Sequence, residues 1–159
     1  MNEIELLQDA DQRARDYVAG VDCRRVFPTA EAITALAGFD ETLPVQGRPS
    51  EETVALMDDL GSPATVVNNG PSYFGFVIGA CLPVAAAAER LSIAWDQCAS
   101  TEDGSPAAYA IERQAGKWLL EVLDLPRESA VAFGTSATAC GLSALAAARA
   151  ELLARQGWD

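Results

Sequence analysis

A run of small and hydroxyl-bearing residues, GTSAT (134–138), separates a short apolar stretch from an alanine-rich segment. The apolar stretch, 131–133, predicts a strand, and the segment after the run predicts a helix. The first N–H groups of a helix have no partner within it, and the helix dipole is positive at that end. With the hydroxyls of Thr135, Ser136 and Thr138, the turn is suited to binding an anion such as a phosphate.

The turn does not follow two common nucleotide-binding motifs. It is not GxxxxGK[ST], because no lysine follows the glycine at the required spacing, and it is not GxGxxG. From the pattern alone, a serine or threonine that caps the helix and binds no ligand explains the turn better than a phosphate site does. Both interpretations therefore stay open at this point.

Other residues that could carry catalysis are scarce. The chain has no histidine, which excludes a Ser-His-Asp or Cys-His mechanism within these residues. Cys23, Cys81, Cys98 and Cys140 share no metal-ligand spacing, so we predict no metal site and expect reduced, half-buried thiols. The single lysine, Lys117, is expected on the solvent side of a helix. We predict no catalytic residue in this chain.

Charge and hydropathy narrow the classes of partner. The 159 residues include 23 acidic and 11 basic ones, for a net charge of −12, whereas nucleic acid and anionic membranes attract basic surfaces. No stretch of about 18 uninterrupted apolar residues is present, and the charged first residues lack a signal core. We therefore expect neither a nucleic-acid nor a membrane partner, and a cytoplasmic location.

The elements that must position the turn follow from periodicity and capping signals. Residues 1–61 predict three acidic amphipathic helices, near 4–18, 29–37 and 50–61, which form a helical N-terminal segment. Thr29 and Ser50 are the predicted N-caps of the second and third helices. Residues 62–159 begin with a glycine-spaced extended stretch and continue with a helix from Pro83. A further helix follows Ser105-Pro106, with Ile111 and Trp118 expected on its buried face. The predicted strand and helix around GTSAT complete the predicted elements.

Three segments, in this order and spacing, resemble the pyridoxal-dependent decarboxylase family. The segments are GPSYFGFVIGACLPVAAAAERLSIAWDQ, SPAAYAIERQAGKWLLEVLDLP and FGTSATACGLSALAAARAELLARQGW. This family comprises the group II enzymes, which include aromatic-L-amino-acid and glutamate decarboxylases. The resemblance covers most of the chain, and residues 1–61 also suit the helical N-terminal extension of the family, which exchanges between the subunits of a dimer.

The resemblance implies a fold, a cofactor and a reaction. The expected fold is the beginning of the aspartate aminotransferase-like (fold type I) large domain, an α/β domain with a mostly parallel sheet, in a homodimer. The expected cofactor is pyridoxal 5'-phosphate, and the expected activity is that of a lyase (a carboxy-lyase) that decarboxylates a small amino-acid substrate. Matching GTSAT to the phosphate loop of the family places Ser136, Ala137 and Thr138 against the cofactor phosphate. The stretch Phe76, Val77 and Ile78 resembles the family segment that lines the substrate pocket.

Three functional residues of the family have no counterpart in this chain. The histidine that stacks on the cofactor, the aspartate that pairs with its ring nitrogen and the lysine that binds it covalently all follow the matched helix in the family. We therefore expect them from a complementary chain or from the remainder of the same enzyme. Two alternatives stay open: a non-catalytic interaction or regulatory fragment, and part of an aminotransferase or desulfurase of the same fold.

Overall fold

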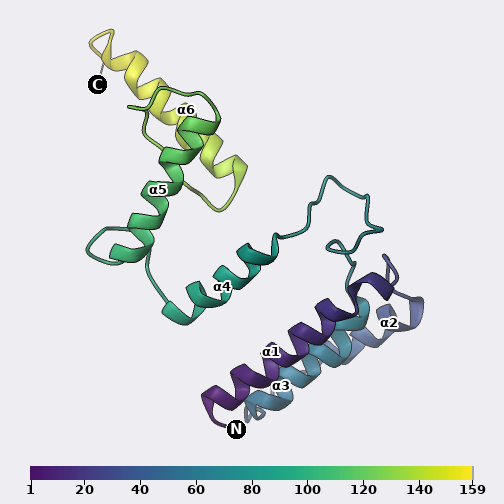
Figure 1. The fold of residues 1–159 in the computed structure, drawn as a ribbon. Helices are drawn as coiled ribbons and strands as arrows, with labels where there is room; N and C mark the ends of the chain where they lie inside the picture. The colour runs from purple at the N-terminus through teal and green to yellow at the C-terminus, as the bar shows by residue number, and fades with distance from the viewer. Residues whose placement is uncertain (159) are drawn as a thin grey trace. The chain divides into compact units, whose positions relative to one another are not determined.

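The computed structural model describes residues 1–158, which fall into two compact units, Met1–Ala87 and Ala88–Asp159. Each unit is described by itself. Six α-helices are joined by turns and loops (Figure 1). The boundary predicted between residues 61 and 62 lies within the first unit. The assignment of residues 1–61 as a segment that exchanges between the subunits of a dimer stays a prediction.

The first unit is a small helical assembly. Its α-helices are α1 (Glu3–Ala19), α2 (Ala30–Ala35) and α3 (Ser50–Leu56), with short 3₁₀ turns η1 (Val21–Cys23), η2 (Leu36–Phe39) and η4 (Ser62–Ala64). A π-helical turn, η3 (Met57–Gly61), continues α3. Helices α1 and α3 lie side by side (Figure 1). The three predicted helices of residues 1–61 are therefore confirmed in number and place.

Local capping explains where these helices begin and end. Asn2 and Glu5 form a reciprocal capping box at the start of α1, with both hydrogen bonds at 2.9 Å, and Gly20 ends the helix. The Thr29 hydroxyl accepts a 3.2 Å hydrogen bond from the Ala32 N–H at the start of α2, as predicted. Ser50, predicted as a cap, is instead the first residue of α3, and Pro49 stands at the cap position.

The second unit contains two whole α-helices and the larger part of a third. The sequence boundary between the units, at Ala87 and Ala88, falls inside helix α4 (Pro83–Trp95). Helices α5 (Pro106–Val122) and α6 (Ala137–Ala154) belong wholly to the second unit. Pro106 is the first residue of α5, as predicted. Ser105 occupies the cap position and is fully buried, but its hydroxyl has no hydrogen-bond partner among residues 1–158.

The predicted α/β class is wrong for this structure. Residues 1–158 form helices, turns and loops and contain no β-strand, which conflicts with a fold type I large domain. The predicted strand 131–133 is an irregular segment. A strand needs a neighbour for its N–H and C=O groups, and the described part of the chain supplies none. Val131 instead contacts α5, where a Cβ placed on Gly116 would lie 3.3 Å from the Val131 Cβ.

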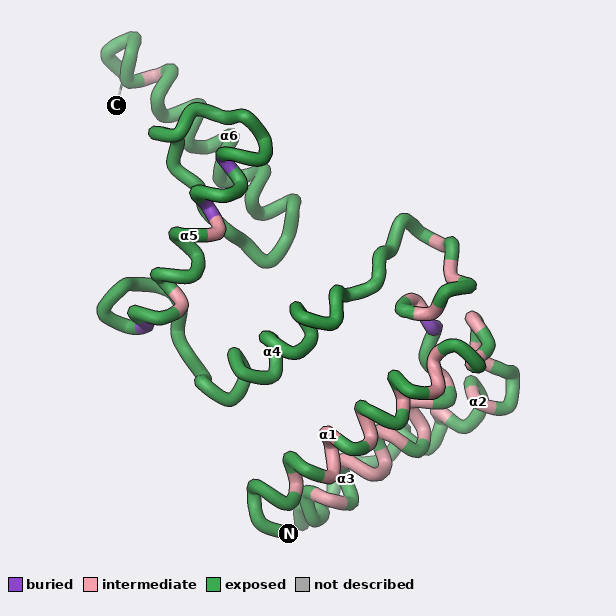
Figure 2. Tube along the Cα trace, in the orientation of Figure 1, coloured by how far each residue is buried: buried purple, intermediate pink, exposed green. Residues whose placement is uncertain are grey.

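The buried side of α5 also differs from the prediction. Ile111 and Trp118 are 59% and 62% exposed, whereas Gly116 and Leu120 are buried (Figure 2). At about 3.6 residues per turn, Gly116 and Leu120 lie roughly opposite Ile111. The segment around Val131 contacts this opposite side. Periodicity located the apolar residues of α5 but not the side that its neighbour covers.

One expectation about exposure is corrected as well. The four cysteines are free but exposed rather than half-buried. Helix α6 is long and apolar enough to cross a membrane by length and composition alone, although Arg149 and Glu151 interrupt it. Core helices of soluble proteins meet the same criterion.

Candidate functional site

The turn before α6 is arranged around the Ser136 side chain. Ser136 has extended backbone angles (φ −149°, ψ 146°) and is the N-cap of α6. Its hydroxyl accepts a 3.1 Å hydrogen bond from the Ala139 N–H, and its carbonyl accepts a 3.0 Å hydrogen bond from the Cys140 N–H. The predicted strand-to-helix turn is thus a capped helix start, and this cap alone accounts for the choice of serine.

The capping leaves two donors available at the positive end of the helix. Within residues 1–158, the N–H groups of Ala137 and Thr138 make no hydrogen bond. No acidic side chain lies in the first turn of α6, and Ser136, Ala137 and Thr138 are all exposed. A phosphate would meet two backbone donors, the Thr138 hydroxyl and the helix dipole without like-charge repulsion. These residues therefore fit the phosphate group of the expected cofactor.

Close approach of the chain explains why the turn is built from small residues. A Cβ placed on Gly134 would lie 2.5 Å from the Cys140 Sγ, well inside van der Waals contact. Gly134 thus passes directly over the first turn of α6, where any larger residue would displace the cysteine side chain. Thr135 and Ser136 follow it into the cap. The loop conformation depends on this glycine for space rather than for an unusual backbone angle.

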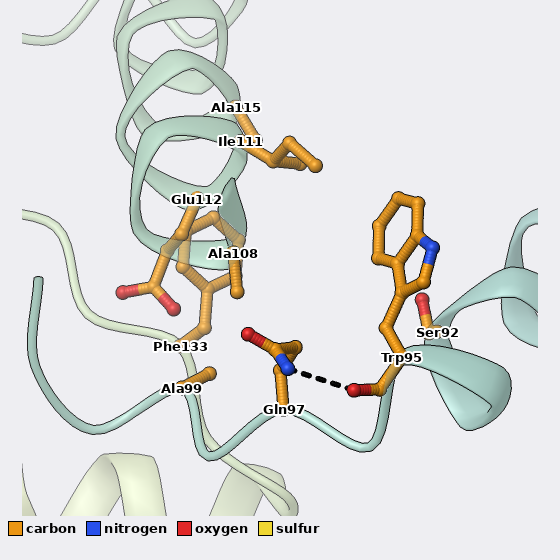
Figure 3. Close-up of a pocket in the computed structure, with 9 residues that line it drawn as sticks. All are labelled: Ser92, Trp95, Gln97, Ala99, Ala108, Ile111, Glu112, Ala115 and Phe133. Atoms are coloured by element: carbon orange, nitrogen blue, oxygen red, sulfur yellow. Dashed lines mark hydrogen bonds between the residues drawn. The ribbon is translucent and has the colours of Figure 1, made fainter. Parts of the chain in front are cut away.

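A hollow of about 340 Å³ lies in the same unit as the α6 turn and shares a chain segment with it (Figure 3). Phe133, the residue immediately before Gly134, lines the hollow with Trp95 and Ile111. The lining is mainly aromatic and aliphatic, and Glu112 and Gln97 are its long polar side chains. Such a lining suits a partly apolar small molecule. Sequence reasoning missed this hollow, because its lining comes from three separate segments.

Gln97 and Glu112 bring an amide and a carboxylate to the hollow. The Gln97 Nε2 donates a 2.7 Å hydrogen bond to the Trp95 carbonyl, which holds this amide at the end of α4 (Figure 3). The Glu112 carboxylate, on α5, lines the same hollow as Phe133 and Ala99 (Figure 3). Trp95 at the end of a helix and Phe133 before a small-residue turn are the two signals from which the site could have been found.

The predicted substrate-pocket residues belong to the other unit. Phe76 and Val77 have left-handed backbone angles, with φ of 53° and 56°. Such angles strain a β-branched valine in particular. Both side chains are almost fully exposed, and Ile78 is half-exposed. Strain of this kind is typical of functional segments. These three residues belong to the Met1–Ala87 unit, whereas the α6 turn belongs to the Ala88–Asp159 unit.

Lys117 lies on the exposed surface of α5, as predicted. It lines a second hollow with Gly116 and Leu120 rather than the hollow beside the α6 turn. A lysine that forms a covalent bond with a carbonyl cofactor needs a desolvated environment. Its exposure therefore agrees with the expectation that Lys117 does not serve this purpose.

No family model, curated protein or solved structure matches the chain. The resemblance to the pyridoxal-dependent decarboxylases and the roles that it implies stay predictions from the sequence.

Proposed function

We propose that the chain contributes the phosphate-binding turn of a pyridoxal-phosphate-dependent amino-acid decarboxylase. The observation that carries this proposal is the start of α6, where Ser136 caps the helix and the N–H groups of Ala137 and Thr138 have no partner among the described residues. The three segments that resemble the family give the cofactor and reaction class. The proposal concerns this turn and does not depend on a sheet.

The residues of this chain would bind and orient rather than react. The N–H groups of Ala137 and Thr138 would donate hydrogen bonds to phosphate oxygens, and the Thr138 hydroxyl would donate another. Ser136 would hold the turn in the conformation that presents these donors. Phe76, Val77 and Ile78 would form part of the substrate pocket wall. When bound, pyridoxal phosphate supplies an electron sink for the bond that breaks when carbon dioxide leaves.

Catalysis requires groups that this chain does not hold. It has no histidine, and its one lysine is exposed. We propose that a complementary chain, or the remainder of the same enzyme, contributes the lysine, histidine and aspartate, in a homodimer of the whole enzyme. Formation of an amine and carbon dioxide, rather than a keto acid, would distinguish this decarboxylase from an aminotransferase.

The turn is tested by adding a fixed charge to it. Ala137→Asp places a carboxylate beside the phosphate position and should weaken binding by at least about tenfold, or about 1.4 kcal/mol. Thr138→Ala removes one donor and should weaken binding less. A suitable probe is 4'-deoxypyridoxine 5'-phosphate, which keeps the ring and phosphate but has no aldehyde to react with Lys117.

Amide chemical shifts of the full chain give the affinity and the location together. The probe should shift the amides of Ala137 and Thr138 saturably. Ala144→Asp, a matched change of an exposed alanine farther along α6, should leave the affinity unchanged. Equal affinity in Ala137→Asp and the unchanged chain would show that the turn is only a helix cap, and would favour the non-catalytic interaction fragment.

A further inference from the structure

A second hollow of the Ala88–Asp159 unit gathers basic side chains in a chain that is otherwise acidic. Three of the six lysines and arginines in residues 88–158 line it: Arg113, Lys117 and Arg127. The hollow measures about 240 Å³ and lies between α5 and the segment 127–131. One carboxylate, Glu112, shares the lining. The chain as a whole has a net charge of −12, so this local excess of positive charge needs its own explanation.

Backbone carbonyls hold Arg127 in position. Its Nη1 donates a 2.6 Å hydrogen bond to the Leu120 carbonyl and a further hydrogen bond to the Leu125 carbonyl. Its Nη2 lies 3.8 Å from Asp124, whose side chain is fully exposed. Because carbonyls at the end of α5 fix one edge of the guanidinium, little side-chain freedom remains to be lost when an anion binds.

The other polar groups come from one helical surface and one loop. The Arg113 guanidinium lies over the Tyr109 ring, 5.9 Å from its centroid, and Lys117 is one turn farther along α5. Ser129, which carries a hydroxyl, also lines the hollow. Arginine, lysine and hydroxyl donors in one hollow form the usual donor set for phosphate oxygens.

The floor of the hollow is formed by close contact between α5 and the following segment. Gly116 is buried, and a Cβ added there would lie 3.3 Å from the Val131 Cβ. The absence of a side chain at this position lets the two segments meet below the basic groups. Leu120 and Val131 add an apolar portion to the lining. The hollow therefore offers charged donors above an apolar floor.

We propose that this hollow binds a small organic phosphate monoester. Three basic side chains and one carboxylate line the hollow, and Asp124 pairs with Arg127 from outside the lining, so the hollow keeps a net positive charge that suits the charge of about −1.5 to −2 on a phosphate monoester at pH 7. The apolar floor accommodates the organic group. This site is separate from the turn before α6, and the proposal does not depend on the proposed decarboxylase function.

Phenyl phosphate is the probe, because it carries no aldehyde and combines the phosphate with a small apolar ring. Titration into the full chain should shift the amides of Gly116, Lys117 and Ser129 saturably. The double variant Arg113→Gln/Lys117→Gln should weaken binding by at least about tenfold. Both positions are exposed on α5, and glutamine is a good helix former, so helix content by circular dichroism should not change.

Two controls separate this site from the rest of the molecule. Arg155→Gln removes a basic residue that pairs with Glu151 outside the hollow, and it should not alter the affinity. Ala137→Asp should also leave the binding of phenyl phosphate at these amides unchanged, so failure of the cofactor turn and failure of this site are distinguishable. Shifts confined to Ala137 and Thr138, or equal affinity in the double variant, would overturn the proposal. Succinate binding as tightly as phenyl phosphate would overturn the phosphate assignment.

Discussion

Arg13 forms ion pairs with residues of two elements of the first unit. From α1 its Nε lies 2.9 Å from Asp9 on the same helix, and its Nη1 lies 2.9 Å from Asp58 in η3. Asp58 also accepts a hydrogen bond from the Ser62 hydroxyl. The Ser62 hydrogen bond is the largest cause of a lowered pKa of Asp58; burial opposes it, and the Arg13 guanidinium lowers the pKa further. One ionised carboxylate thus links α1 to the turn after α3.

The link should make the first unit sensitive to acid. Because the folded pKa of Asp58 lies below its ordinary value of 3.8, the contribution to stability is present above that pH and is lost as the pH falls through the lowered folded value. Asp58→Asn should lower the free energy of unfolding by about 1 kcal/mol near neutral pH. The difference between the variant and the unchanged chain should narrow at acid pH.

Urea unfolding at neutral pH and at about pH 3 measures this difference. Asp59→Asn is the matched control, since Asp59 is 72% exposed and lies 3.7 Å from the same Arg13 Nη1. It should have little effect at either pH, as exposed ion pairs contribute little. A constant difference between Asp58→Asn and the unchanged chain at both pH values would contradict the assigned role of Asp58.

At the level of the helices, the helix caps could be predicted from the sequence, but the contacts between segments distant in the sequence could not. Thr29 and Ser136 cap their helices as the sequence predicts, because an N-cap hydrogen bond spans only three residues. The burial of Gly116 was not predictable, because it depends on contact with Val131, which is 15 residues away. The strand predicted at 131–133 failed for the same reason, since a strand requires a distant partner.

The candidate site shows the same division. The α6 turn was found from a run of consecutive residues, whereas the hollow beside it needed three segments to meet around Phe133. The basic hollow was missed because Arg113 and Lys117 are four residues apart on α5 and their third partner, Arg127, follows the helix. Sequence reasoning therefore located the capped start of α6 but neither hollow.

Two glycines within helices test whether α5 is held by its contact with Val131. Gly141→Ala, in α6, adds a methyl group to open space and should stabilise the chain by about 0.5–1 kcal/mol, because alanine favours the helix. Gly116→Ala adds the same methyl group 3.3 Å from the Val131 Cβ. The contact should cancel most or all of that gain.

Denaturant unfolding monitored by helical circular dichroism compares the two variants directly. A bulkier pair, Gly116→Leu and Gly141→Leu, should widen the difference, because a leucine at 116 has to displace the segment around Val131. Equal stabilisation by both alanine substitutions would show that the segment 127–131 does not rest on α5 and would remove the floor of the basic hollow.

At the level of the whole chain, few side chains are buried within their own units. Among residues 1–158, four are buried: Val67, Ser105, Gly116 and Leu120. Large apolar side chains remain exposed in both units, among them Phe74 and Phe76 at 94% and 90%. Because burial of apolar area is the main source of folding stability, such a chain gains much from a partner. This agrees with the proposed complementary chain and homodimer.

Helix α6 offers the clearest place to test this need for a partner. Leu142, Leu145 and Leu152 are 70%, 72% and 61% exposed and fall on one side of the helix. Exposed apolar surface of this extent favours association. We expect the isolated chain to sediment as a species larger than its 16.7 kDa mass and to bind the apolar dye ANS. Leu145→Glu/Leu152→Glu should shift the chain towards the monomer and reduce dye binding.

The matched control is Ala147→Glu/Ala150→Glu, which places the same two charges on the opposite side of α6. If the leucine side is the contact surface, this control should associate like the unchanged chain, although its net charge equals that of the leucine variant. Equal loss of association in both variants would assign the effect to charge repulsion rather than to the leucines. A monomeric chain that binds no dye would contradict the inference that α6 is covered by a partner, because its leucines would then be stable in water.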